Sequence, residues 1–266
     1  MCDHQLTPGK EIRLADLPTD GKKFAESRKD AEKEFKALRE ELIELQACMY
    51  AEDKHKLLVV FQAMDAGGKD GTIRKVFTGV NPQGVRVHSF KAPTKEELAH
   101  DYLWRIHKVV PPRGMIGIFN RSHYEDVLVV RVENIVPESV WRKRYDQINE
   151  FEELLSETGT KILKFFLHIS LDEQKERFQD RIDVPSKNWK FSMDDLEKRK
   201  KWSDYMEAYE EALNQCTTEC APWHVIPANQ KWYRNLAITR TIVQALRDLD
   251  LQYPVQKDDL SNVVIE

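Results

Sequence analysis

Short, continuous runs of hydrophobic residues recur along the chain, and stretches with a helical pattern separate them. The first run, Leu57 to Phe61, is apolar at every position, which is typical of a strand buried on both faces of a parallel sheet. Similar runs follow at residues 85–90, 115–119, 162–169 and 223–226. This alternation predicts an α/β fold, with a parallel five-stranded sheet flanked by helices and joined by right-handed crossovers.

Apolar residues that recur every three or four positions mark the helices. The longest pattern predicts a helix over residues 23–51. Further helices are predicted at residues 69–78, 94–109, 140–155, 172–182, 193–213 and 232–249. We expect a single domain over residues 23–253. An irregular arm (1–22) precedes it, and an extended or loosely ordered tail (254–266) follows it.

Positive and negative charges nearly balance. Of the 266 residues, 41 are Lys or Arg and 45 are Asp or Glu, so the formal net charge is −4. That balance excludes a generally basic nucleic-acid binder, but it leaves room for a local basic channel. Hydrophobic residues make up 41% of the chain, which is enough to build a core.

The sequence carries no targeting or membrane signal. No apolar run approaches the roughly 20 residues of a membrane span, and the first residues have no apolar signal-peptide core. The four cysteines form no Cys-x-x-Cys pair. We therefore expect reduced thiols, a cytoplasmic location, and neither a membrane nor a nucleic acid as partner.

A glycine-rich segment follows the first strand and opens a helix, which is the position of a phosphate-binding loop. Glycines let successive N–H groups point at an anion, the next helix adds its positive end, and Lys69 supplies a mobile cation. The match to G-x-x-x-x-G-K-[S/T] is imperfect, because Ala63 and Asp70 replace the first glycine and the hydroxyl residue. An ordinary glycine-rich turn is the alternative. The expected phosphate-binding residues here are Ala66, Gly67, Gly68, Lys69, Asp70, Gly71 and Thr72.

Asp65 lies inside the same loop. Bound phosphates would repel its carboxylate unless a divalent cation lay between them. Asp65 is therefore the first candidate for a Mg²⁺ ligand, with Mn²⁺ as the alternative metal.

A second polar cluster, residues 120–126, follows the predicted strand 115–119. The carboxyl ends of parallel strands line the ligand crevice, so Asn120, Arg121, Glu125 and Asp126 are well placed. We expect Asp126 to be a metal or water ligand; a helix cap or an ion pair with Arg121 is the alternative. The sequence leaves open which of Asn120, Glu125 and Asp126 contacts the metal.

Residues 61–72 and 119–126 together closely resemble the polyphosphate kinase 2 family. Shorter matching stretches lie at residues 81–85, 189–191 and 221–228. The version Asn-Arg-Ser-His-Tyr-Glu-Asp-Val-Leu resembles class III, which is described as acting on both AMP and ADP. The resemblance implies a P-loop kinase core similar to thymidylate kinase, with a helical lid, in a homodimer or homotetramer.

The resemblance also implies site residues. Asp65 and Lys69 match the family's loop acid and loop lysine, and Arg121 matches the arginine of its second motif. Many members have Asp at position 120 and Arg at position 126. Here these are Asn120 and Asp126, so the second acidic metal ligand is expected at position 126.

Basic residues further along fit a donor channel for polyphosphate. Residues 175–201 contain nine Lys or Arg, and a break near Pro185 is typical of a lid loop. Arg177 and Arg181 are four residues apart and share a helix face. With Lys190, they are expected to line the channel; a solvated helix face is the alternative. One of Arg74 and Lys75, both candidates one turn into the loop helix, is also expected to reach polyphosphate. Nucleotide contacts are expected at Asn81, Asn120 and Arg121.

We therefore expect an enzyme that transfers a phosphoryl group from inorganic polyphosphate to AMP and ADP, directly and with Mg²⁺. No phosphohistidine is needed, because positioning and charge neutralisation supply the catalysis. Two alternatives stay open at this point. One is an ATP-dependent nucleoside-monophosphate kinase, and the other is a non-catalytic binder of polyphosphate or nucleic acid.

Overall fold

The computed structural model describes residues 4–256, 263 and 265. Its five strands form one parallel sheet in the order β2-β3-β1-β4-β5, so the predicted α/β fold is confirmed. The strands are β1 (Lys56–Gln62), β2 (Val85–Ser89), β3 (Ile116–Asn120), β4 (Thr160–His168) and β5 (Trp223–Pro227).

Helices connect successive strands, and one further helix lies at each end: the first precedes β1 and the last follows β5. They are α1 (Arg28–Glu52), α2 (Lys69–Val76), α3 (Lys95–Leu98), α4 (Trp104–His107), α5 (Val129–Val132), α6 (Glu138–Trp141), α7 (Lys143–Glu157), α8 (Leu171–Asp183), α9 (Met193–Lys200), α10 (Trp202–Gln215) and α11 (Lys231–Arg247). Five 3-10 turns complete the described elements: η1 (Leu14–Asp16), η2 (Lys22–Phe24), η3 (Pro82–Gly84), η4 (His123–Asp126) and η5 (Pro185–Lys190). Among the described residues, no helix has both the length and the apolar character of a membrane span.

Three predicted helices are each divided in two. The stretch 94–109 contains α3 and α4; between them the Asp101 side chain accepts hydrogen bonds from the N–H groups of Leu103 and Trp104 and holds a turn in place of a continuous helix. The stretch 140–155 contains the end of α6 and most of α7. The stretch 193–213 is interrupted at Lys201, where ψ is 23°.

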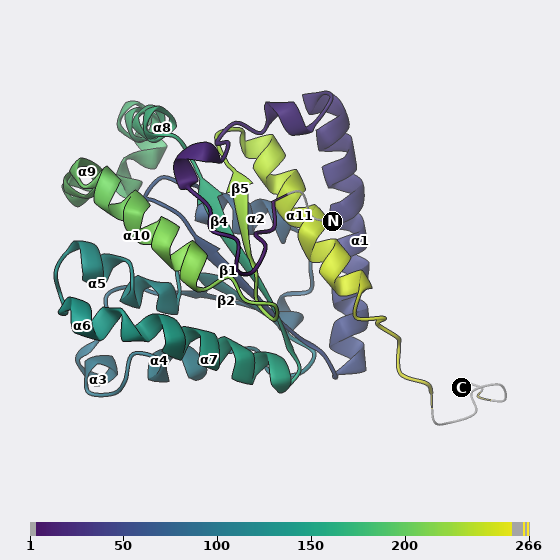
Figure 1. Cartoon of the computed structure of the whole chain (residues 1–266). Helices are drawn as coiled ribbons and strands as arrows, with labels where there is room; N and C mark the ends of the chain where they lie inside the picture. The colour runs from purple at the N-terminus through teal and green to yellow at the C-terminus, as the bar shows by residue number, and fades with distance from the viewer. Residues whose placement is uncertain (1–3, 257–262, 264, 266) are drawn as a thin grey trace.

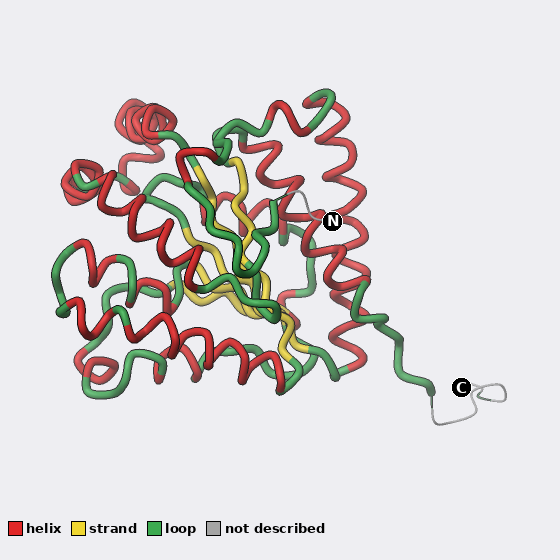
Figure 2. Tube along the Cα trace, in the orientation of Figure 1, coloured by secondary structure: helices red, strands yellow, loops and turns green. Residues whose placement is uncertain are grey.

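The sheet lies between two helical layers (Figures 1 and 2). Alternate residues of β1 explain why the strand is apolar throughout. Leu57 and Val59 pack in one cluster with α1, α2 and α11, whereas Leu58 and Val60 pack in the other with α7 and α10. Complete burial of each such side chain contributes about 1.5–3 kcal/mol.

The described part of the N-terminal arm covers the β5 edge of the sheet. Gln5 forms an antiparallel bridge with His224, and the Leu6 N–H donates to the Trp223 carbonyl at 2.8 Å. Leu6 and Leu14 are buried. The arm therefore satisfies strand groups that an open edge would expose. Beyond α11, residues 251–256 have no helix or strand, and most of the predicted tail lies outside the described residues.

Candidate active site

The glycine-rich loop joins the end of β1 to α2, in the centre of the sheet. Two of its residues adopt the left-handed conformation, Ala66 with a φ of 62° and Gly68 with a φ of 101°. Gly68 is required for a second reason: a Cβ at this position would lie 2.1 Å from Nη1 of Arg234. The backbone therefore turns sharply before Lys69, the first residue of α2.

Donors from α8 hold three successive carbonyls of this loop. Gln174 Nε2 donates to the Asp65 carbonyl at 2.9 Å, and Arg177 Nη1 donates to those of Ala66 and Gly67, each at 2.9 Å. The first N–H groups of α2 have no acceptor inside the helix. The loop therefore offers N–H groups and a helix N-terminus to an anion.

Asp65 lies among three positive charges. Arg121 Nη2 donates to its Oδ1 at 2.9 Å, and Lys198 Nζ lies 3.9 Å from its Oδ2. Burial alone would raise the pKa of the Asp65 carboxyl, but the charges of Lys69, Arg121 and Lys198 lower it. Asp65 is therefore ionised and available to a cation.

Lys69 points back across the loop, and its Nζ donates to the Ala63 carbonyl at 2.9 Å. Burial and the charge of Arg121 lower the pKa of Lys69 to about 8, against the opposing effect of nearby carboxylates. A buried cation with a lowered pKa is poorly solvated, which suits it to bind a phosphate oxygen.

The loop after β3 meets the glycine-rich loop. Arg121 has a φ of 64°, and its N–H donates to the Phe61 carbonyl at 3.0 Å. Asn120 Nδ2 donates to Asp70 Oδ1 at 2.7 Å. Strain in a left-handed arginine is typical of functional sites. The two loops are thus fixed to each other by side chains expected in the site.

A cleft of about 650 Å³ opens over these loops. Ten basic and three acidic residues line it, although the whole chain is negative. This cleft is therefore strongly positive, as a polyanion site requires. The predicted residues in its lining are Asp65, Ala66, Gly67, Gly68, Lys69, Asp70, Gly71, Arg74, Asn120, Arg121, Arg177, Arg181 and Lys190. A larger hollow of about 860 Å³, between α1 and Arg240, lies apart from these loops.

Three other predicted phosphate or nucleotide residues do not line this cleft. Thr72 is buried, and its hydroxyl donates to the Gly68 carbonyl at 3.0 Å. Lys75 is exposed on α2 outside the cleft. Asn81 caps η3, where its side chain accepts from the Gln83 N–H. Thr72 and Lys75 face away because a helix distributes consecutive side chains around its axis, and Asn81 lies beyond the end of α2.

Arg177 lines the cleft but is fully engaged. Its Nε donates to Glu173, its Nη1 to two loop carbonyls, and its Nη2 to the carbonyls of Ala228 and Asn229. A guanidinium has five N–H groups, and all five have acceptors here. Arg177 therefore supports the loop, rather than offering a free donor to polyphosphate.

Asp126, the predicted second metal ligand, does not line either of the two cavities that Asp65 lines. Its Oδ1 accepts from Arg144 at 3.1 Å, and its Oδ2 lies 3.8 Å from Arg105. Its neighbour Glu125 shares a small cavity, of about 50 Å³, with Asp65, Arg121 and Lys198. Successive residues of the 3-10 turn η4 point about 120° apart, so only one of the two adjacent carboxylates faces the cavity.

The oxygen donors near the cleft fit a magnesium ion. Among the described residues there is no group of three His, Cys, Asp or Glu side chains that could hold a metal alone. Mg²⁺ commonly takes only one or two carboxylates and completes its shell with phosphates and water. Asp65 and Glu125 supply two such carboxylates at one cavity.

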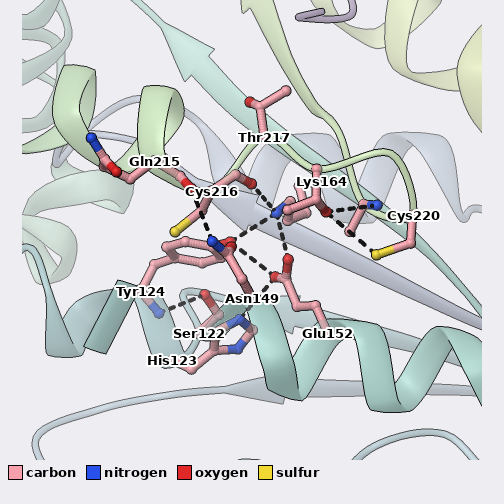
Figure 3. Close-up of polar contacts among 12 residues, drawn as sticks. Ser122, His123, Tyr124, Asn149, Glu152, Lys164, Gln215, Cys216, Thr217 and Cys220 are labelled. Carbon is pink, nitrogen blue, oxygen red and sulfur yellow. Dashed lines mark hydrogen bonds and ion pairs between the residues drawn. The ribbon is translucent and has the colours of Figure 1, made fainter. Parts of the chain in front are cut away.

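A buried polar network supports the second loop from behind (Figure 3). Lys164 Nζ donates to Glu152 Oε2 at 2.5 Å, to the Tyr124 hydroxyl at 2.8 Å and to the Cys216 carbonyl at 2.6 Å. Glu152 Oε1 also lies 3.1 Å from His123 Nε2. His123 thus has a structural partner on α7, in the part of the motif that follows Arg121.

Sequence reasoning missed several residues of the cleft. Lys231 and Arg234 come from α11, and Lys91 follows β2. Lys187 and Asp180 were also missed; they form an ion pair at 2.5 Å. Ligands of parallel sheets bind at the carboxyl ends of the strands. Applied to β2 and β5 as well as to β1 and β3, this rule indicates Lys91, Lys231 and Arg234.

The parallel sheet, the glycine-rich loop after its central strand and the basic cleft define a P-loop kinase-like α/β protein. A family model described as polyphosphate kinase 2 matches residues 25–254, and the chain belongs to that family. The resemblance read from the sequence is therefore confirmed.

Individual relatives agree. A Meiothermus ruber protein named AMP/ADP-polyphosphate phosphotransferase is 57% identical over 267 residues and covers 100% of both chains. A Rhodopseudomonas palustris protein named ADP-polyphosphate phosphotransferase is 46% identical over 92% of this chain and 89% of its own. The crystal structure of polyphosphate kinase 2 from Arthrobacter aurescens TC1 superimposes with a TM-score of 0.93 at 43% identity, over 97% of this chain and 92% of that one.

Proposed function

We propose that this chain transfers phosphoryl groups from inorganic polyphosphate to AMP and ADP, giving ADP and ATP. The observation that carries the proposal is the positive cleft at the glycine-rich loop, in a chain of negative net charge. The names of the two relatives support the choice of donor and acceptors. The class III version of the second motif agrees with action on both nucleotides.

In the proposed reaction, a terminal phosphate oxygen of the nucleotide attacks the terminal phosphorus of polyphosphate. The bridging P–O bond breaks, and the shortened polyphosphate leaves with its electron pair. The acceptor oxygen is already anionic, so no general base is required. Lys69 and Arg121 neutralise charge that spreads over the phosphoryl oxygens.

Magnesium is the proposed cofactor, with Mn²⁺ as the alternative. Asp65 and Glu125 would hold it, since their carboxylates face one small cavity. When bound, the ion supplies positive charge that screens the carboxylates from the phosphates. Asn120 keeps Asp70 fixed to the second loop, and it is the proposed contact to the nucleotide together with Arg121.

The segment 175–201 is the proposed lid. Arg181 Nη1 donates to the Lys190 carbonyl at 3.0 Å and lies 3.1 Å from Asp195, so η5 and α9 are tied to α8. Arg181 and Lys190 line the cleft and are the proposed polyphosphate contacts of the lid. Closure would exclude water, which would otherwise hydrolyse the donor.

We also propose that the protein works in the cytoplasm as a homodimer or homotetramer. Cys48, Cys216 and Cys220 are free thiols in the described part of the chain, as a reducing compartment allows. Light scattering after size-exclusion chromatography would give the subunit number.

The decisive experiment mixes the purified protein with AMP, Mg²⁺ and inorganic polyphosphate and follows the nucleotides by chromatography. We expect ADP first and then ATP. A parallel reaction with ATP in place of polyphosphate tests the monophosphate-kinase alternative. Binding of polyphosphate without any transfer would support a non-catalytic binder and contradict the proposal.

A further inference from the structure

Helix α11 brings a second buried guanidinium to the glycine-rich loop. The Arg234 side chain lines the cleft, although the residue is only 3% exposed. Its guanidinium lies directly against the backbone of Gly68: a Cβ on Gly68 would be 2.1 Å from Arg234 Nη1, and one on Gly71 would be 3.9 Å from Nη2. Arg234 therefore faces the turn where α2 begins.

This guanidinium has no ion-pair partner of its own among the described residues, because the carboxylate of Glu173, which acts on it from further away, pairs with Arg177. Nε and Nη2 both donate to the Asn235 amide oxygen, at 3.3 and 3.1 Å, and Arg234 forms no ion pair within 4.0 Å. Nη1 has no hydrogen-bond acceptor in the described part of the chain. Burial and the charge of Arg177 lower the pKa of Arg234 to about 9, against the opposing effect of the Glu173 carboxylate. Burial of an uncompensated cation destabilises a fold, unless an anion completes the site.

Arg177 lies beside Gly68 as well, since the same Cβ would be 3.4 Å from its Nη1, but it is the opposite case. Its five N–H groups donate to the Glu173 carboxylate and to four backbone carbonyls. It can contact a ligand only if it gives up one of these bonds. Both arginines line the cleft, but only Arg234 keeps an N–H donor without an acceptor among the described residues.

We propose that Arg234 binds the phosphate group held by the glycine-rich loop, and that Arg177 is a positioning residue that fixes the loop. The bound oxygen would be shared by Arg234 Nη1, Lys69 and the first N–H groups of α2. This inference rests on the proposed function, since it names a ligand contact for the same site. An Arg–phosphate contact is charge-assisted and, at a buried position, nearly unscreened by salt.

The test measures thermal unfolding and binding of inorganic tripolyphosphate for the full chain. The variants are Arg234→Gln, Arg234→Lys and the control Arg247→Gln, which removes an arginine from the exposed end of the same helix. Without ligand, Arg234→Gln should melt at or above the wild-type temperature, because a buried unpaired charge is removed. Its dissociation constant for tripolyphosphate should rise at least tenfold, and the ligand-induced rise in melting temperature should largely disappear. Arg234→Lys should keep part of the affinity, and Arg247→Gln should bind as the wild type does.

A structural role for Arg234 predicts the reverse pattern. Arg234→Gln would then melt well below the wild type without ligand and would bind tripolyphosphate with unchanged affinity in its folded fraction. That result, or wild-type protein that does not bind tripolyphosphate, would overturn the inference. Transfer to AMP is measured on the same wild-type preparation. Binding that depends on Arg234 without transfer would contradict the proposed function and leave this inference intact.

Discussion

Arg121 Nη2 donates a hydrogen bond to Asp65 Oδ1 at 2.9 Å, across 56 residues of sequence. The contact joins the loop after β1 to the loop after β3, and it sets a cation beside a carboxylate at the mouth of the cleft. Each charge stabilises the other at a partly buried position, where water screens them less. The pair therefore holds both side chains where phosphates and a metal would meet them.

Replacement of either loop residue should remove transfer and keep the fold. Asp65→Asn and Lys69→Ala should each lower kcat by about 10²–10³ or more, because preorganised charge is lost at the transferred group. Circular dichroism would check the fold, and the exposed Asp204→Asn is the charge-matched control. Near-normal activity in either variant would show that the site has been wrongly assigned.

Activity should depend on the protonation of Lys69. Its pKa is lowered to about 8, mainly by burial. As the pH rises through this value, the free protein loses the ammonium charge, so kcat/KM for polyphosphate should fall above pH 8. Bound phosphate favours the charged form, so the decline in kcat should lie at higher pH.

Lys69→Arg is the control for this pH profile, since a guanidinium stays charged in the same range. Its activity should be lower, but the decline near pH 8 should be absent. An unchanged profile in this variant would assign the titration to another group.

Glu125 and Asp126 should behave differently although they are adjacent. Glu125→Gln should raise the Mg²⁺ concentration needed for half-maximal activity several-fold, because this carboxylate faces the cavity with Asp65. Asp126→Asn should mainly destabilise the fold, since Arg105 and Arg144 lose their shared carboxylate. Mg²⁺ titrations and thermal melts of both variants measure the difference. If Asp126→Asn raised the Mg²⁺ requirement and Glu125→Gln only lowered stability, the metal ligand would be Asp126.

The network behind the second loop should dominate local stability. Lys164→Met leaves Glu152 buried without its cation, and it should cost about 3–5 kcal/mol of unfolding free energy. The double variant Lys164→Met with Glu152→Gln should recover part of that loss. Urea denaturation of the single and double variants gives the coupling; strict additivity of the two changes would contradict it.

Glu152 also gives this network a pH dependence. Burial would raise its pKa, but Lys164 and His123 lower it below the usual value of 4.5. Its stabilising contribution is therefore complete above pH 4.5 and is lost as the pH falls through the lowered pKa. The acid limb of the stability curve should become shallower in the double variant.

Arg177 should be needed for loop geometry. Arg177→Lys cannot satisfy the Glu173 carboxylate and four carbonyls with three donors, so we expect a loss of about 2–3 kcal/mol in the protein without ligand. Lys175→Met, an exposed change on the same helix, should have little effect. Equal melting temperatures for Arg177→Lys and wild type would show that the loop holds its shape unaided.

The local pattern of residues was sufficient to predict the architecture and to place Lys69 at a glycine-rich turn after a buried strand. A fully apolar strand followed by glycines and Lys69 predicts a buried strand and an anion-binding turn, because both depend on neighbouring residues alone. The helix divisions at Asp101 and Lys201 were missed because they depend on a side-chain hydrogen bond within a turn and on backbone angles, which the apolar period does not record.

The sequence by itself determined that a parallel sheet carries Asp65, Lys69 and Arg121 at its carboxyl edge. Only the tertiary structure decided between the adjacent Glu125 and Asp126 at the small cavity. It also decided that Arg234, from a distant helix, keeps a donor without an acceptor among the described residues, whereas Arg177 does not. The reason is directional. In a helical turn, one position of difference rotates a side chain by about 100–120°, and its partners then come from distant elements that only packing brings together.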